Sequence, residues 1–268
     1  MLLIAAALSE EISLVREMCT AQATISSGGI HAWTAKCSGK EICMLKTGMG
    51  PARSARTFDR FLAEYRPAEV LVIGYAGALD PALRPGDLVL VQRAAILSAP
   101  QKMPFWKASI GECWEMLPCQ ELVDLCRVRG VEIHTGEVLT SPFVVGNPIQ
   151  KKWLYEHFGA AIVDMETAEL ARIAASKSLP LRCVRSISDS ATDDFFAPLS
   201  HHSDLNPASK AVKLVTTGNW LRRCQQWRQN SSLARASMRR FLGVYLDAYA
   251  SRTKSHRRDA EIAEAAKD

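Results

Sequence analysis

Two short acidic turns, each at the end of an apolar run, constrain the fold of this chain more than any other feature. The first run, residues 160–163, leads into Asp164-Met165-Glu166, and the second, residues 181–187, leads into Ser188-Asp189. Small and apolar residues at helical spacing separate them. The pattern predicts a strand–helix–strand unit of a parallel sheet, with both turns at the edge where open α/β sheets bind ligands. We therefore expect Glu166 and Asp189 to face one crevice.

The rest of the first 190 residues repeats this alternation. Apolar runs at 2–8 and 70–74 are typical of parallel strands buried on both faces. Helical spacing follows at 9–19, 51–65 and 120–129, and residues 31–45 resemble a hairpin. Residues 97–118 have no clear period, which is typical of a binding loop or lid. Together these elements predict an α/β domain with a central sheet.

Charge and cysteine usage narrow the class of protein. The net charge is +5, but from residue 210 onward there are 13 Lys/Arg and 5 Asp/Glu, against 20 and 23 before it. This distribution argues against nucleic-acid binding, because the basic residues of a nucleic-acid-binding domain should lie on its folded face. The eight cysteines form no Cys-x-x-Cys pair, which favours reduced thiols in a cytoplasm.

Three further features each allow a structural and a functional interpretation. Glu11 follows the first apolar run, so it either complements a helix dipole or lines the crevice as a base. Gly48 and Gly50, with Arg53 nearby, form either a tight turn or an anion site at a helix N-terminus. Phe143 either stacks on a planar ligand or belongs to the core. His201 and His202 suggest metal, but adjacent residues suit a solvated loop better, so we predict no metal site.

The C-terminal part differs from the rest in composition. Residues 209–250 alternate tryptophans and aliphatic side chains with arginines at helical spacing. The pattern predicts helices that pack on the sheet with a basic outer face, or a segment that contacts anionic lipid. Residues 251–268 are charged and poor in large apolar side chains, so we expect a disordered tail.

The order of these elements resembles the purine nucleoside phosphorylase and nucleosidase superfamily, particularly the methylthioadenosine/S-adenosylhomocysteine nucleosidases. The resemblance spans residues 1–192, and six pieces carry it: Ala-Leu-Ser-Glu-Glu-Ile from Ala7, Lys-Thr-Gly-Met-Gly from Lys46, Gly-Tyr-Ala-Gly-Ala-Leu from Gly74, Pro-Gly-Asp-Leu-Val from Pro85, Val-Asp-Met-Glu-Thr-Ala from Val163, and Arg-Ser-Ile-Ser-Asp from Arg185. Met-Glu followed about twenty residues later by Ser-Asp is the most specific combination.

The resemblance implies a role for each site residue. Asp189 would protonate the departing purine base, and Glu11 would activate water. Glu166 would accept the ribose hydroxyls, and Met165 would pack beneath the ribose. Phe143 would stack on the base and the backbone of Val144 would contact its edge. Ala76 and Gly77 would line the base pocket, and Ser188 would orient Asp189.

The chain also departs from the nucleosidases. Tyr75 stands where they usually carry a small serine, and the loop Thr-Ser-Pro-Phe before Val144 is shorter than theirs. About seventy residues follow Asp189, with a basic, tryptophan-bearing character. Such a tail resembles the hopanoid-associated phosphorylases, which remove adenine from adenosylhopane.

We therefore expect a three-layer αβα phosphorylase/hydrolase-like fold with a central mixed sheet and an extra C-terminal helical region. The expected parts are a catalytic domain (1–208), basic amphipathic helices packed on it (209–250) and a disordered tail (251–268). The expected protein is a cytoplasmic homodimer, peripheral to the membrane if its C-terminal helices bind lipid, that cleaves an adenine nucleoside without a cofactor. The attacking group is water, or phosphate held by Gly48, Gly50 and Arg53. A non-catalytic nucleoside-binding protein is the alternative of another class.

Overall fold

The computed structural model describes residues 1–27, 29–37, 39–98, 107–117, 120–194 and 220–265. The strands of this part are β1 (Leu2–Ala6), β2 (Thr20–Ser27), β3 (Ile30–Cys37), β4 (Lys40–Lys46), β5 (Glu69–Ala78), β6 (Leu88–Ser98), β7 (Ser109–Glu115), β8 (His134–Thr140), β9 (Ile162–Asp164) and β10 (Leu181–Asp189). The helices are α1 (Ser9–Arg16), α2 (Pro51–Glu64), α3 (Gln120–Val128), α4 (Pro148–Phe158), α5 (Thr167–Ser176) and α7 (Trp220–Ala265). Helices separate the strands from β1 to β10 except in two runs of three consecutive strands, β2 to β4 and β5 to β7.

The strands form one mixed sheet in the order β10-β6-β8-β9-β5-β1-β4-β3-β2, and β7 pairs with β6. An additional parallel pairing joins β10 to β5. Because of it, β5, β10, β6, β8 and β9 form a closed ring, while β1, β4, β3 and β2 extend from β5 as an open sheet. The expected central mixed sheet is confirmed, and the ring is a feature that apolar periodicity does not predict.

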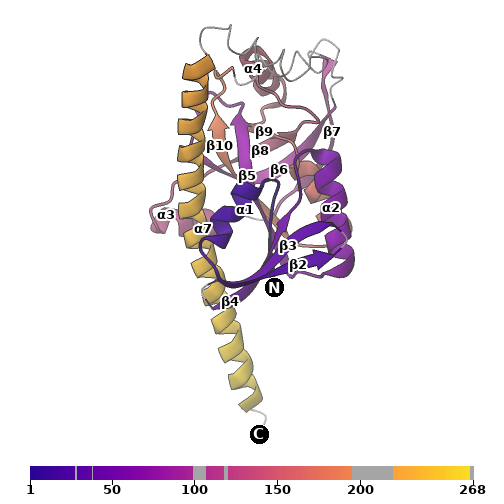
Figure 1. Ribbon diagram of the computed structural model, residues 1–268, viewed down its shortest axis with the longest axis vertical. Helices are drawn as coiled ribbons and strands as arrows, with labels where there is room; N and C mark the ends of the chain where they lie inside the picture. The colour runs from indigo at the N-terminus through magenta and orange to yellow at the C-terminus, as the bar shows by residue number, and fades with distance from the viewer. Residues whose placement is uncertain (28, 38, 99–106, 118–119, 195–219, 266–268) are drawn as a thin grey trace.

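Helices cover the two faces of this sheet and give three layers (Figure 1). On one face α2 and α5 pack on the strands through side chains such as Phe58, Phe61 and Leu170. On the other face α1, α3 and α7 bury Ile12, Leu122 and Phe241 against the alternate side chains of the same strands. The three-layer αβα architecture is confirmed.

The strand directions around the acidic turns differ from the expected parallel unit. β10 runs parallel to β5, but β9 runs antiparallel to β5, with Gly77 opposite Val163 and Ala78 opposite Ile162. β9 therefore runs back from the end of β5 and carries its acidic turn alongside Ala76. Both acidic turns still reach the same place, but through the closed ring rather than through a shared edge of parallel strands.

Two other segments also differ from expectation. Strand β5 continues through residues 75–78, beyond the apolar run at 70–74, because the paired β10 extends as far as Asp189. Residues 109–115, expected in an irregular lid, form β7 on the edge of β6. The rest of that expected lid, at 99–106 and 118, lies outside the described residues. Helix α4, which periodicity did not reveal, follows the loop at 141–147.

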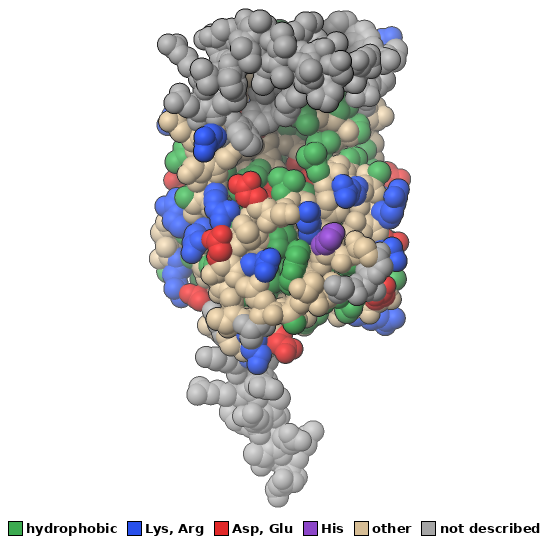
Figure 2. Space-filling model, viewed as in Figure 1, with side chains coloured by type: hydrophobic (Ala, Val, Ile, Leu, Met, Phe, Trp, Pro, Cys, Tyr) green, Lys and Arg blue, Asp and Glu red, His purple; other side chains and the backbone are tan. Residues whose placement is uncertain are grey.

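Helix α7 runs along the body and projects beyond it towards the C-terminus (Figure 1). Met238, Phe241, Leu242 and Tyr245 are buried in the core, so these residues are not available to a membrane surface. The backbone continues as one helix past residue 251 to Ala265. None of the helices in the described ranges combines the length and apolar character needed to span a bilayer. On the face shown in Figure 2, basic and acidic side chains are interspersed.

Candidate active site

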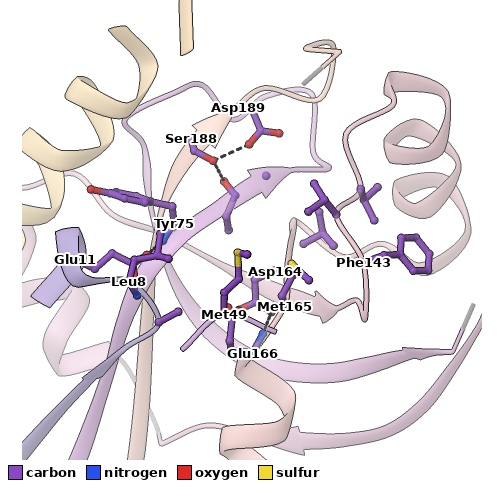
Figure 3. Close-up of a pocket in the computed structure, with 16 residues that line it drawn as sticks. Leu8, Glu11, Met49, Tyr75, Phe143, Asp164, Met165, Glu166, Ser188 and Asp189 are labelled. Atoms are coloured by element: carbon purple, nitrogen blue, oxygen red, sulfur yellow. Dashed lines mark hydrogen bonds between the residues drawn. The ribbon is translucent and has the colours of Figure 1, made fainter. Parts of the chain in front are cut away.

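One pocket collects most of the predicted site residues (Figure 3). Its empty volume is about 680 Å³, counted with the open mouth. It lies where β1, β5, β8, β9 and β10 end or approach one another. Of the predicted residues, those that line it are Glu11, Ala76, Gly77, Phe143, Val144, Met165, Glu166, Ser188 and Asp189. Gly48, Gly50 and Arg53 are absent from this lining.

Glu11 is buried in the first turn of α1, and backbone amides hold its carboxylate. The Oε2 atom accepts a hydrogen bond from the N–H of Leu8 at 2.8 Å, and Oε1 accepts one from the N–H of Tyr75 at 3.0 Å. Burial raises the pKa of Glu11, while the charge of Arg185 and these backbone N–H groups oppose the rise. Glu11 is therefore a fixed carboxyl group at the pocket wall, with its proton affinity increased by burial.

Glu166 lies at the start of α5, on the turn that follows β9. Its Oε1 atom accepts a hydrogen bond from the N–H of Gly50 at 2.8 Å, and its Oε2 atom lies 3.9 Å from Nη2 of Arg185. Burial and the neighbouring charge of Asp164 raise the pKa of Glu166 to about 7. A small change in its surroundings therefore decides whether this group carries a charge near neutral pH.

Arg185 on β10 is the buried cation that Glu11, Asp164 and Glu166 share. Its Nη2 atom pairs with Oδ2 of Asp164 at 2.7 Å, and the guanidinium also donates to the hydroxyl of Thr167. A Cβ on Gly74 would lie 2.0 Å from Nη1 of Arg185 and 2.9 Å from Oε1 of Glu11. Only glycine therefore lets the arginine and the carboxylate meet across β5.

Asp189 ends β10 and is held on both oxygens. The hydroxyl of Ser188 donates to Oδ1 of Asp189 at 2.6 Å and also lies 3.2 Å from the carbonyl oxygen of Ala76. If Asp189 is protonated, Ser188 can accept from it and donate to Ala76 instead, so this contact suits both forms of the acid. A Cβ on Gly77 would lie 2.9 Å from Oδ2 of Asp189, so the glycine leaves room for the carboxyl group.

The second oxygen of Asp189 contacts a buried cation that sequence reasoning missed. Nζ of Lys151, on the first turn of α4, forms an ion pair with Oδ2 of Asp189 and donates to the carbonyl oxygen of Ser190 at 2.7 Å. The side chain of Lys151 is fully buried. The sequence offers two adjacent lysines, Lys151 and Lys152, and nothing in their spacing says which one faces inward.

Phe143 lines the pocket, but its ring points away from the centre of the cavity (Figure 3). The ring packs against the cluster that includes Val145, Leu154 and Val163. The core interpretation therefore describes this conformation, and a ring that stacks on a base would have to rotate. Met165 and the exposed side chain of Val144 line the same pocket.

The backbone amides of the glycine loop, Gly48 and Gly50, form hydrogen bonds within the protein. The N–H of Gly48 donates to the carbonyl oxygen of Ala7 at 3.2 Å, and the N–H of Gly50 donates to Glu166. Both glycines have positive φ, 86° and 91°, which suits glycine and not larger residues. Arg53 is exposed, and its side-chain stem lies against Gly48. These amides are thus already engaged, and the loop positions Glu166.

No group of three or more His, Cys, Asp or Glu that could hold a metal occurs within the described ranges. His201 and His202 lie outside them. Arg185 stands inside an apolar run, and an arginine there is as compatible with an exposed strand position as with a buried one. Its burial among three carboxylates becomes visible only in three dimensions.

Comparison with known proteins supports the fold. A family model described as the phosphorylase superfamily matches residues 2–217. Among solved structures, the Neisseria meningitidis 5′-methylthioadenosine/S-adenosylhomocysteine nucleosidase in complex with methylthio-immucillin-A is 18% identical, with a TM-score of 0.69 over 92% of this chain and 98% of that one. The Helicobacter pylori futalosine hydrolase is also 18% identical, with a TM-score of 0.72 over 92% of this chain and 97% of that one.

Proposed function

The chain belongs to the phosphorylase superfamily, and we propose that this enzyme hydrolyses the N-glycosidic bond of an adenine nucleoside. The observation that carries the proposal is the pocket itself, which is lined by four buried carboxyl groups, Glu11, Asp164, Glu166 and Asp189. Asp164 is paired with Arg185, which leaves Glu11, Glu166 and Asp189 as the candidates for the chemistry. Several buried carboxyl groups gathered in one pocket are what acid–base cleavage of a glycosidic bond requires.

In the proposed reaction Asp189 gives a proton to N7 of the base as the bond between C1′ and N9 breaks. The electron pair of that bond goes to the base, and the sugar acquires oxocarbenium character. Glu166 accepts the ribose hydroxyls, and its negative charge favours the cationic sugar. Water adds to C1′ while Glu11 takes a proton from it. Burial raises the pKa of Glu11, which helps this carboxyl group to accept the proton. Adenine and the free sugar leave.

Water is the better-supported nucleophile, because the amides and cations near the pocket that could bind an anion are already engaged. The amides of Gly48 and Gly50 are engaged within the protein. Arg53 does not line the pocket, and Arg185 is already surrounded by carboxylates. An attacking phosphate would therefore meet negative charge without a free cradle. The names of the similar structures, nucleosidase and hydrolase, also favour water.

The test is adenine release by the purified protein from methylthioadenosine and adenosine, with and without phosphate. We expect release without phosphate, together with the free sugar. Glu11→Gln should lose most of this activity, whereas Glu10→Gln, at the exposed neighbouring position of the same helical turn, should retain it. Asp189→Asn should bind the nucleoside but release no adenine. A protein that binds nucleosides and releases adenine under neither condition would instead be the non-catalytic binder.

A second candidate is phosphorolysis of a nucleoside with a large apolar 5′ substituent, as in the hopanoid-associated phosphorylases. Three apolar side chains of the pocket lining favour such a substituent, because they are exposed: Leu8 (37%), Met49 (60%) and Val144 (39%). This candidate predicts adenine release only with phosphate, and a sugar 1-phosphate as the second product. Contact of α7 with a membrane and assembly into a homodimer stay predictions.

A further inference from the structure

We propose that Lys151 is a positioning residue for departure of the base, acting through Asp189. The proposal rests on the proposed function and adds a residue to it. Lys151 does not line the pocket, so it cannot contact the substrate in this arrangement. Its ammonium group instead pairs with Oδ2 of Asp189.

The placement of Lys151 is costly for the fold. Its side chain is fully buried, and a buried charge is tolerated only when it is paired and hydrogen-bonded. It also lies in the first turn of a helix, where the dipole disfavours a cation. Asn147 fixes this turn, because its side chain accepts from the N–H of Ile149 at 2.8 Å and its carbonyl oxygen accepts from the N–H of Lys151 at 3.0 Å. A costly charge held by a capped helix is expected where function uses it.

The chemistry of the proposed reaction gives that use. When Asp189 donates its proton to the base, it becomes a carboxylate inside the protein. Lys151 and the hydroxyl of Ser188 then each contact one of its two oxygens, so the new negative charge is stabilised where it forms. The same two contacts fix the plane of the carboxyl group before the proton moves. Lys151 thus lowers the barrier to proton transfer without contacting the substrate.

The test compares two leaving groups in Lys151→Met. Adenine needs a proton to depart, whereas the nitrophenolate of 4-nitrophenyl riboside departs as a stable anion. We expect kcat for the adenine nucleoside to fall about 100-fold, the effect typical of one lost charge-stabilising contact, with KM nearly unchanged. Release of nitrophenolate should change little. Because the ratio of the two rates is measured on one preparation, incomplete folding of the variant cancels from it.

Two further variants sharpen the result. Lys152→Met removes the neighbouring lysine, whose side chain is 75% exposed, and should leave both rates unchanged. Lys151→Gln keeps a donor without the charge, so it should show the same selective loss if Lys151→Met folds poorly. Equal loss for both substrates would mean that Lys151 is structural, and no loss for adenine release would also overturn the proposal. Failure of the wild-type protein to release adenine would instead refute the proposed function.

Discussion

Titration of Glu166 should make the folded protein less stable as the pH rises, and this direction can be tested directly. Burial and the charge of Asp164 raise its pKa from 4.5 to about 7 in the folded protein. The folded state therefore binds this proton more tightly than the unfolded state does. Below pH 4.5 both states hold the proton and the group contributes no difference. As the pH rises from 4.5 to 7 the unfolded chain loses its proton first, and the folded protein is destabilised.

The magnitude follows from the width of that window. Each pH unit between the two pKa values is worth about 1.4 kcal/mol, so the window from 4.5 to about 7 corresponds to roughly 3 kcal/mol. Glu166→Gln removes the titration, and its amide oxygen can still accept from the N–H of Gly50. We therefore expect the variant to be more stable than the wild type by up to about 3 kcal/mol at pH 8, and by little at pH 4.5.

The assay is urea unfolding of the ligand-free proteins at pH 5, 6, 7 and 8, with the free energy of unfolding extrapolated to water. Glu156→Gln is a matched control, because it makes the same chemical change at an exposed position of α4, and it should alter stability by less than about 0.5 kcal/mol. A stability difference between Glu166→Gln and wild type that stays flat across this range, or grows towards acid, would refute the reasoning. Activity should be lost in the variant at every pH.

Two further predictions concern the glycines of β5. Gly77→Ala places a methyl group 2.9 Å from Oδ2 of Asp189, so kcat should fall about 100-fold through displacement of the acid, while the thermal midpoint changes little; an unchanged kcat would contradict this geometry. Gly74→Ala places its methyl group 2.0 Å from Nη1 of Arg185, in the middle of the buried charge cluster. It should destabilise the protein by more than about 3 kcal/mol in urea unfolding, and a normal unfolding midpoint would show that the cluster is looser than described.

The sequence predicted which residues share the pocket better than it predicted the strand directions that bring them together. Glu166 and Asp189 share a pocket as expected, yet the expectation assumed parallel strands, and β9 runs antiparallel to β5. An apolar run specifies a buried strand but carries no information on direction or neighbours. The order of elements was sufficient to predict the three layers. Closure of the ring, in contrast, depends on pairing between strands that are far apart in the sequence.

The residues that sequence reasoning missed are the cations of the site. Arg185 and Lys151 each form an ion pair with a carboxylate that lies on another element. Helical or strand periodicity distinguishes faces of an element, but it does not identify the partner across a core. The carboxylates were found because each follows an apolar run at a turn, which is a local signal. The conformation of Phe143 is likewise decided by packing against α4. The apolar pattern of α4 is too weak to predict this helix from the sequence.

The closed ring of strands has a mechanical consequence for the pocket. Every strand of the ring is hydrogen-bonded on both sides, so β9 and β10 cannot move apart without breaking pairings along two edges. Glu166 lies two residues after the end of β9 and Asp189 ends β10, whereas Met49 and Phe143 lie on segments between elements. We therefore expect the pocket to have one stiff wall that keeps the spacing of these two carboxyl groups, and one compliant wall that adapts to the bound molecule.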